Sequence, residues 1–517
     1  MSTKSRHDLD TVDADIESTL HRSIHLRRRN NFLASSFLRL PTELILKIFV
    51  HAIDLGRPLS HNDSPLVLTA ICHQLREVGI TFPQLWSTVD FITPLTTELY
   101  LERCKYDPHI LLAMESRFTL YCPAEDQKWE AVWEKLEGRT FNNLHSLVFE
   151  GASHAFADRM VGVLRRAPNI SNIDLSYFYR VHLHGELSWS LSDPVPHLST
   201  LRLRNFYISW TSPLLRNLNH LTLDPGIFFI SSPIETFLTA LANCPDLETL
   251  DLSYAGPDQL DSHQDNCDTI VQLRRLRGLS LRFRNPSEIR YILSHIGYSA
   301  STAVRLKASV GAGADLSEAI SQLLPPCKVE ALQRSQRSKA LTVRLDDVYT
   351  FFTNTLSVCF CPYGYVGSRH SPQVLSRFAS KIVEVVGRDT VTSLDMQAWQ
   401  TIFPDGMWKV LSHQLPRLER IRYDLDEVEG GADSPDPFVL VFSQPFEGGP
   451  ICPQLQHMEL PWRVFTQDSS AAVLKRALTE RGACGRRLKR IGLSDDAGER
   501  DKTVALEPFR DLVDEVG

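Results

Sequence analysis

Few residues in this sequence have the types and the spacing that enzymatic or metal chemistry requires. Cys359 and Cys361 form a Cys-x-Cys arrangement, but no second Cys or His pair follows at the spacing of a zinc site. The polar run 263–268 reads as an exposed loop, and the glycines of 311–314 lack the Lys-Ser/Thr that completes a phosphate loop. The motifs GxSxG and HExxH do not occur. We therefore expect a chain that is not an enzyme and has no metal or cofactor.

The composition excludes several classes of partner. The chain has 517 residues, of which 43% are hydrophobic and 23% charged, as in an ordinary folded protein. It carries 55 basic and 62 acidic side chains, so no cationic excess is available to neutralise the phosphates of a nucleic acid. No apolar window approaches the ~18 residues that a membrane helix needs. We expect neither nucleic acid nor a membrane among the partners.

The cysteines indicate a reducing compartment. Ten cysteines are spread over the chain from Cys72 to Cys484, which is too dilute for a disulfide scaffold. The first ten residues contain no apolar signal segment. We therefore expect reduced thiols and a cytoplasmic or nuclear location.

The first 33 residues differ in composition from the rest of the chain. Residues 8–17 hold five acidic and no basic side chains, and the stretch 21–29 is rich in arginine. A thin apolar stripe runs through both, which predicts a charged helix or tail.

Residues 34–91 predict a small helical domain. Apolar residues from Leu40 to Ile53 recur at helical spacing, Pro41 suits the first helical position, and Glu43 suits the first turn. A second helix is expected over 66–78, and Pro83 opens a third short segment. A unit this small often completes its core against a partner. The alternative is a cap on the next domain of the chain.

This region resembles an F-box in its fungal F-box-like form, over about 50 residues. The segments that carry the resemblance are Leu40-Pro41-Thr42-Glu43-Leu44-Ile45, Ile48-Phe49, Ala70-Ile71-Cys72-His73-Gln74-Leu75-Arg76-Glu77-Val78 and Pro83-Gln84-Leu85-Trp86-Ser87-Thr88-Val89. One departure is Leu75, which stands where the family usually has Trp. The resemblance implies docking onto the Skp1 adaptor of a cullin-RING ubiquitin ligase. The residues that it assigns to this docking are Leu40, Pro41, Leu44, Ile45, Ile48, Leu68, Cys72, Leu85 and Trp86.

A repeat dominates the chain from residue 141. The pattern apolar-x-x-apolar-x-apolar starts at positions 144, 170, 198, 218, 247 and 276, so the intervals are 26, 28, 20, 29 and 29 residues. These intervals match the period of leucine-rich repeats, roughly 20–29 residues. Each copy predicts a short strand with one buried face. Helices are expected at 156–164, 234–241, 289–296, 316–324, 373–386, 405–414 and 471–480.

The expected architecture is α/β: a three-helix F-box-like domain followed by an irregular solenoid that resembles leucine-rich repeats. The expected domains are a tail at 1–33, the F-box-like domain at 34–91, linker or capping helices at 92–140, the repeats at 141–494 and a tail or cap at 495–517. The repeats are irregular over 310–390, and 428–450 reads as a surface loop. Stacked helix–strand units bury their apolar faces against one another. The alternative is a globular α/β sheet with similar triplets.

Residues between the buried strand positions should share one surface of the solenoid. Two basic clusters are expected on it, the first at 202–204 and the second at 282–307. The residues expected to bind the target are Arg202, Arg204, Arg282, Arg284 and Arg305. Arginine binds carboxylate and phosphate groups through two hydrogen bonds, which favours an acidic or phosphorylated protein segment as target. Ordinary solvated charge is the alternative. The sequence thus predicts a substrate receptor of a ubiquitin ligase, and the rival interpretation is a repeat scaffold without a ligase role.

Overall fold

The structure is a computed structural model of the chain. It describes residues 3–55, 65–90, 93–104, 112–116, 126–137, 141–150, 162–176, 195–206, 208–224, 232–257, 269–311, 314–326, 340–345, 349–363, 371–399, 403–426, 435–446, 449–494 and 505–516. The chain divides into two compact units. Unit 1 comprises Met1–Leu183 and Asp193–Leu198, and unit 2 comprises His184–Ser192 and Ser199–Gly517.

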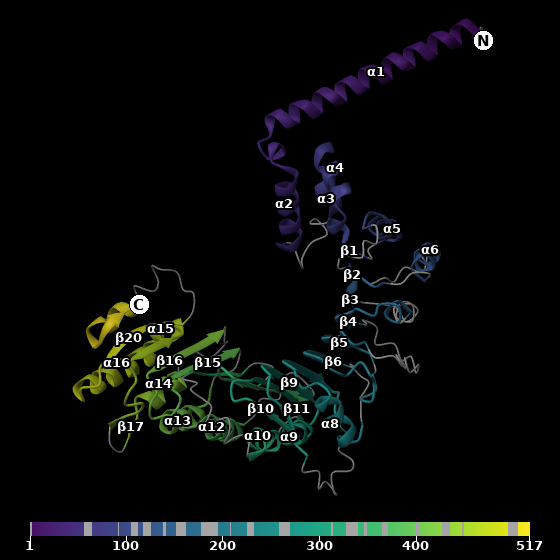
Figure 1. The fold of residues 1–517 in the computed structure, drawn as a ribbon. Helices are drawn as coiled ribbons and strands as arrows, with labels where there is room; N and C mark the ends of the chain where they lie inside the picture. The colour runs from purple at the N-terminus through teal and green to yellow at the C-terminus, as the bar shows by residue number, and fades with distance from the viewer. Residues whose placement is uncertain are drawn as a thin grey trace. The chain divides into compact units, whose positions relative to one another are not determined.

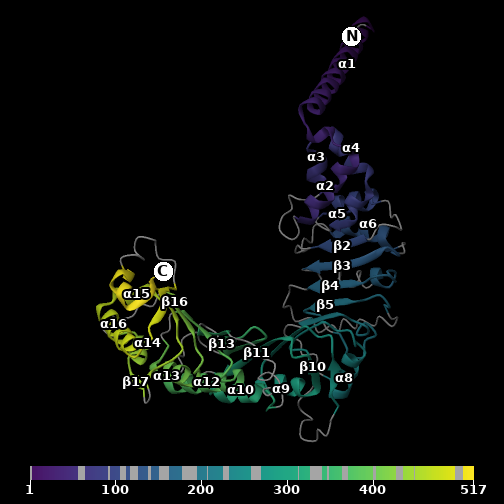
Figure 2. The same ribbon diagram turned by 60° about the vertical axis from the view of Figure 1, so that its left-hand side comes forward.

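Both units combine helices with mostly parallel strands, which confirms the α/β class (Figures 1 and 2). In the described part of the chain, no helix combines the length and the apolar character needed to cross a membrane. The boundary between the units falls inside the segment 141–494, which the sequence had suggested as one array of repeats.

Unit 1 begins with helices and continues into a parallel sheet. Its described elements are α1 (Thr3–Ala34), η1 (Phe37–Arg39), α2 (Thr42–Leu55), α3 (Pro65–Ala70), α4 (His73–Thr81), η3 (Pro83–Trp86), β1 (Thr88–Asp90), α5 (Pro94–Arg103), β2 (Leu112–Ser116), α6 (Asp126–Glu137), β3 (Leu144–Glu150) and β4 (Asn172–Ser176). The strands pair in parallel in the order β1-β2-β3-β4. Helix α1 agrees with the charged helix expected for the first 33 residues.

The helix expected over 66–78 is interrupted, so that prediction was wrong in its length. Helix α3 ends at Ala70, and Cys72 adopts an extended conformation before α4 begins. The Nε atom of Arg76 donates a 3.0 Å hydrogen bond to the carbonyl of Thr69. The side chain thereby satisfies a carbonyl at the end of α3, which lets the chain turn there.

The segment 92–140 is more than a linker with capping helices. Helices α5 and α6 are present, but strand β2 lies between them in sequence and pairs with β1 on one side and β3 on the other. The sheet of unit 1 therefore begins at Thr88, within the segment assigned to the F-box-like domain, and runs without interruption through β3.

Unit 2 alternates strands with helices. Its described elements are β5 (Thr200–Arg204), β6 (His220–Asp224), α8 (Ile234–Ala242), β7 (Thr249–Ser253), β8 (Val271–Leu273), β9 (Gly278–Phe283), α9 (Pro286–His295), β10 (Ile296–Tyr298), β11 (Ala303–Gly311), α10 (Leu316–Leu323), β12 (Ala340–Leu345), β13 (Tyr349–Phe352), β14 (Leu356–Tyr363), α12 (Pro372–Val386), β15 (Ser393–Trp399), α13 (Asp405–Gln414), β16 (Arg420–Asp426), α14 (Pro437–Phe442), β17 (Pro445–Phe446), β18 (Gly449–Pro450), β19 (His457–Leu460), α15 (Trp462–Thr466), α16 (Asp468–Ala483), β20 (Leu488–Leu493), η5 (Glu507–Leu512) and β21 (Val513–Val516).

The main sheet of unit 2 does not follow chain order throughout. From β5 the strands pair as β5-β6-β7-β9-β11, then β14-β13-β12, then β15-β16-β19-β20-β21. Strand β13 is antiparallel to both of its neighbours, and the other pairs in this sheet are parallel. The segment between β12 and β15 in sequence therefore inserts β13 and β14 into the sheet. The sequence interpretation did not anticipate these two strands.

The repeated triplets form the core as predicted. In the six regular copies, all three apolar positions are at most 2% exposed. The strand pairs align them, so that Leu201, Leu221, Leu250 and Leu279 lie in one row. Helices α9, α10, α12 and α13 lie side by side along one face of the unit 2 sheet (Figures 1 and 2). Their bounds confirm the helices expected in those positions, whereas most of 156–164 lies outside the described residues.

Two expectations for the last hundred residues need correction or refinement. The segment 428–450 is not simply a surface loop, because 437–442 forms helix α14 and buries Phe438 and Val441. The end of the chain caps the sheet, since β21 pairs in parallel with β20. Aromatic packing explains α14: the ring of Phe438 lies 4.7 Å from that of Trp408 on α13.

Candidate binding surfaces

Helix α2 exposes part of its apolar surface. Ile45 and Phe49 are buried, but Leu44 and Ile48, one helical turn apart, are 45% and 43% exposed. Pro41, three residues before Leu44, is also exposed. These three residues, Pro41, Leu44 and Ile48, form what we call the α2 stripe. Because a folded helix normally turns its apolar side inward, a stripe of this kind is a candidate docking surface.

Three of the residues that the F-box resemblance assigned to docking lie inside unit 1 instead. Ile45 is 1% exposed, Leu85 is 4% exposed and Trp86 is 0% exposed. The Nε1 atom of Trp86 donates a 2.8 Å hydrogen bond to the carbonyl of Gly79, and its ring packs edge-on against Tyr100 at 5.1 Å. These side chains hold unit 1 together, so they are not available to a partner in this conformation.

The remaining assigned residues are intermediate. Leu40, Leu68 and Cys72 are half-buried. Arg103 lies 4.3 Å above the ring of Trp86, and burial lowers the pKa of its guanidinium. This cation–π contact adds to the packing around Trp86. The α2 stripe is therefore the most accessible of the surfaces that the resemblance pointed to.

Unit 2 presents the second candidate surface. Along each main strand, the positions between core residues are half-buried or exposed, as the alternation of a strand requires. We call this surface the polar sheet face. Its described members include Arg202, Arg204, Thr222, Asp224, Asp251, Ser280, Arg282, Arg284, Arg305, Lys307, Arg344, Thr350, Ser357, Cys359, Cys361, Asp395, Gln397, Arg422, Asp424 and Glu459.

The structure brings the second predicted basic cluster together. Strands β9 and β11 pair directly, with Arg282 opposite Lys307 and Ser280 opposite Arg305. Arg284 comes directly after β9, and it is exposed like Arg282 and Arg305. Several cations therefore lie on, or directly after, two neighbouring strands.

The first predicted cluster lies apart from the second. Arg202 and Arg204 are exposed on β5, which β6 and β7 separate from β9. The row that starts at Arg202 continues through Thr222 and Asp251. An acidic side chain therefore interrupts the basic surface between the two clusters.

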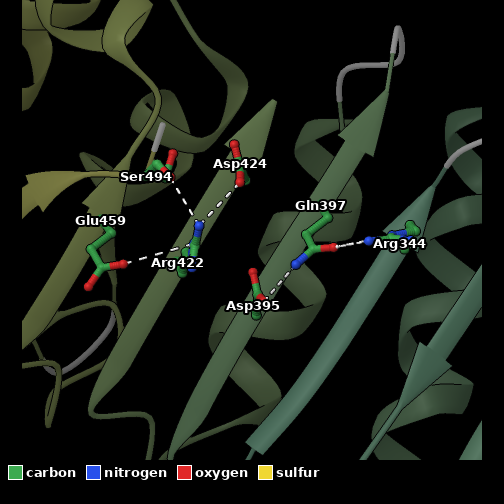
Figure 3. A network of polar contacts seen from close by, with 7 residues as sticks. All are labelled: Arg344, Asp395, Gln397, Arg422, Asp424, Glu459 and Ser494. Carbon is green, nitrogen blue, oxygen red and sulfur yellow. Dashed lines mark hydrogen bonds and ion pairs between the residues drawn. The ribbon is translucent and has the colours of Figure 1, made fainter. Parts of the chain in front are cut away.

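Towards β19 the polar sheet face becomes a network of mixed charge (Figure 3). Arg344 donates to the amide oxygen of Gln397 at 2.7 and 3.1 Å, and the amide nitrogen of Gln397 donates to Asp395 at 2.9 Å. Burial raises the pKa of the Asp395 carboxyl, and the hydrogen bond from Gln397 and the charge of Arg422 oppose that rise. These hydrogen bonds hold the side chains of Arg344, Gln397 and Asp395 in a defined arrangement without a bound partner.

A second part of this network centres on Arg422 (Figure 3). Its Nη2 atom lies 3.4 Å from a carboxylate oxygen of Asp424 and 3.0 Å from the carbonyl oxygen of Ser494, and its Nε atom lies 4.0 Å from Glu459. Sequence reasoning did not select Asp395, Gln397, Arg422, Asp424 or Glu459. The alternation of apolar and polar residues along these strands contained the signal, since each of the five lies one position from a buried apolar residue. Those buried residues are Leu394, Met396, Ile421, Tyr423 and Met458.

The structure adds no support for a metal site or for a functional loop among the residues that it describes. Among the described residues, no group of three or more His, Cys, Asp or Glu side chains is placed to hold a metal ion. The polar run 263–268 lies outside the described residues, as does part of 311–314. Cys359 and Cys361 lie on β14 within the polar sheet face.

No protein-family model matches this sequence, and no curated protein is significantly similar to it.

Proposed function

We propose that this chain is the substrate-recognition subunit of an SCF-type (Skp1–cullin–F-box) ubiquitin ligase. In this proposal the F-box-like helices of unit 1 dock on Skp1, and the leucine-rich-repeat-like array holds a protein target. The observation that supports it most is the α2 stripe. Pro41, Leu44 and Ile48 belong to the segment that resembles the F-box, and Leu44 and Ile48 are apolar yet over 40% exposed.

Helix α2 buries Ile45 and Phe49 but leaves Leu44 and Ile48 exposed, and exposed apolar side chains of this kind favour a partner with an apolar groove. Burying a Leu or Ile side chain contributes about 1.5–3 kcal/mol, and nearly half of each of these two residues is still available. Two such residues one turn apart form a stripe that a helical groove accommodates. The Skp1 adaptor is the partner that the F-box resemblance implies for this segment.

The polar sheet face supports the second half of the proposal. The cations of β9 and β11 suit an acidic or phosphorylated target segment, because arginine forms paired hydrogen bonds to carboxylate and phosphate. The chain would then act by proximity. It raises the effective concentration of target lysines near the charged conjugating enzyme and contributes no chemistry of its own.

Skp1 binding by purified full-length protein tests the first half. We expect Leu44→Asp/Ile48→Asp to weaken Skp1 binding more than a hundredfold, since both charges would be buried in the complex. Ile270→Asp is the matched control, because Ile270 is 53% exposed in unit 2. Thermal melting of each variant shows whether it folds. If the native protein does not bind Skp1, the ligase proposal is wrong and the rival scaffold interpretation stands.

Target capture tests the second half. The variant Arg202→Glu/Arg282→Glu/Arg284→Glu should lose the proteins that native protein recovers from cells. Lys409→Glu/Arg476→Glu is the control, since these exposed residues lie on helices α13 and α16. An unchanged set of recovered proteins would remove the polar sheet face from the proposal.

A further inference from the structure

Cys359 and Cys361 lie next to each other on the polar sheet face. They alternate on β14 with Val358 and Phe360, which are buried on the opposite face. Both cysteines are half-buried, and their Sγ atoms are 4.0 Å apart. Strand β14 is paired on both sides, with β11 and with β13, so the backbone holds the two thiols in this arrangement.

Cations face this pair from the adjacent strands. Cys359 lies opposite Lys307 on β11, and Lys307 lies opposite Arg282 on β9. On the other side, Cys359 lies opposite Thr350 on β13. Positive charge beside a thiol stabilises the thiolate, which is the nucleophilic form of cysteine.

The two thiols differ in acidity. The pKa of Cys361 is lowered to about 6, mainly by a hydrogen bond from Cys359 and also by the charges of Lys307 and Arg282, which together outweigh the effect of burial. The pKa of Cys359 is raised, because it supplies that hydrogen bond and is partly buried. At neutral pH one thiolate and one thiol therefore lie side by side.

We propose that Cys359 and Cys361 form an oxidant-sensitive dithiol, in which Cys361 reacts with a hydroperoxide and Cys359 then forms a disulfide with Cys361 along β14. This proposal does not depend on ubiquitin-ligase function. It requires only the two sulfurs, their 4.0 Å separation and the cations of β9 and β11.

The reaction proceeds in two steps. The Cys361 thiolate attacks one oxygen of the hydroperoxide, the O–O bond breaks, and the departing alkoxide or hydroxide takes a proton from solvent. Sulfur loses two electrons and becomes a sulfenic acid, and the peroxide is reduced to an alcohol or water. The Cys359 sulfur then attacks the Cys361 sulfur. The S–S bond forms, the S–O bond breaks, and the hydroxyl group leaves with the Cys359 proton as water.

Strand geometry makes this disulfide easy to reduce. Two residues of an extended strand advance the backbone by about 6.6–6.8 Å, at the upper limit of the Cα separation that a disulfide spans. Strained disulfides have higher reduction potentials than structural ones. We therefore expect a reversible modification that mild thiol reductants remove.

Peptide mass spectrometry of the full-length protein tests the proposal directly. Trypsin releases residues 345–369, a peptide in which Cys359 and Cys361 are the only cysteines. After brief treatment with hydrogen peroxide, this peptide should lose two hydrogen atoms and resist alkylation, and dithiothreitol should reverse both effects. Cys359→Ser should instead stop at a sulfenic acid that dimedone traps, and Cys361→Ser should give neither product.

The pH dependence of alkylation tests the role of the cations. The rate at Cys361 should rise with an inflection near pH 6, whereas an ordinary thiol inflects near ~8.5. Lys307→Met should move the inflection to higher pH. Cys484, an exposed thiol at the end of α16, is the internal comparison and should be insensitive to Lys307→Met.

Two results would overturn the proposal. One is a peptide whose cysteines alkylate fully after peroxide treatment or oxidise no faster than Cys484. The other is a Cys359→Ser variant in which no sulfenic acid is trapped at Cys361. In either case the pair would be a structural feature of β14 without this reactivity.

Discussion

The carboxylate of Asp436 and the guanidinium of Arg463 form a 2.9 Å ion pair in which the aspartate side chain is only 2% exposed. Asp436 caps helix α14 and accepts a 2.9 Å hydrogen bond from the backbone N–H of Phe438. Its own backbone N–H donates to the hydroxyl of Ser470 on α16 at 2.9 Å. Asp436 thus links α14 to α15 through Arg463 and to α16 through Ser470.

Removing the cation of this pair should destabilise unit 2. We expect Arg463→Met to lower the free energy of unfolding by about 3 kcal/mol, because a buried carboxylate loses its partner. Arg510→Met is the matched control: Arg510 and Glu507 are also 2.9 Å apart but both are more than half exposed, so the loss should be small. Urea unfolding followed by fluorescence measures both. Equal effects would show that burial of Asp436 does not strengthen the pair.

The same carboxylate predicts a pH dependence of stability. Burial raises the pKa of Asp436, although the charge of Arg463 and the N–H of Phe438 oppose the rise. A carboxyl whose pKa is raised in the folded state adds most to the stability of the protein below its unfolded pKa of ~3.9. This added stability is lost as the pH rises through the pKa of the folded state. The side chain of Asp436→Asn does not titrate. The melting temperature of this variant minus that of native protein should therefore increase as the pH rises from about 4 to 7. A constant difference over this range would contradict the assignment.

Gly79 is required by the close approach of α3. A Cβ atom at this position would lie 2.5 Å from Cγ2 of Thr69. Gly79→Ala should therefore destabilise unit 1 by about 1–3 kcal/mol, the usual cost of overpacking. Thr69→Ser removes the clashing methyl group and keeps the hydroxyl that donates to Leu66 O. The double variant Gly79→Ala/Thr69→Ser should recover most of the lost stability in thermal melting. If it recovers none, the clash does not involve the methyl group of Thr69.

Neighbouring residues of α2 should separate folding from binding. Ile45→Ala should destabilise unit 1 by about 2–4 kcal/mol, because the side chain is 1% exposed and leaves a cavity. Leu44→Ala should change the melting temperature little, since Leu44 is 45% exposed. If Leu44→Ala destabilises as much as Ile45→Ala, the α2 stripe belongs to the core of unit 1 and is not a docking surface.

Local patterns predicted a large part of the fold. The triplet at 247, 250 and 252 predicted a buried strand face, and the apolar spacing over 373–386 predicted helix α12. These predictions succeeded because alternation and helical periodicity are properties of a few consecutive residues. The same logic selected Arg282 and Arg305 as exposed, and the structure places them on adjacent strands.

Other features depend on residues far apart in the chain. The apolar pattern of α2 marks both Leu44 and Ile45, and only packing against the rest of unit 1 buries Ile45 and leaves Leu44 exposed. The sequence predicted a loop around 437–442, because residues typical of turns lie on both sides of it. The short helix α14 forms there because Phe438 packs against Trp408 and Asp436 pairs with Arg463.

The sequence by itself determined which side chains alternate between core and surface, since that depends on local spacing. The tertiary structure alone decided that β14 inserts between β11 and β13, which places Cys359 beside Lys307, a residue 52 positions earlier in the chain. No local pattern encodes such a pairing, because strand order results from the competition among all strands for neighbours and for a shared core.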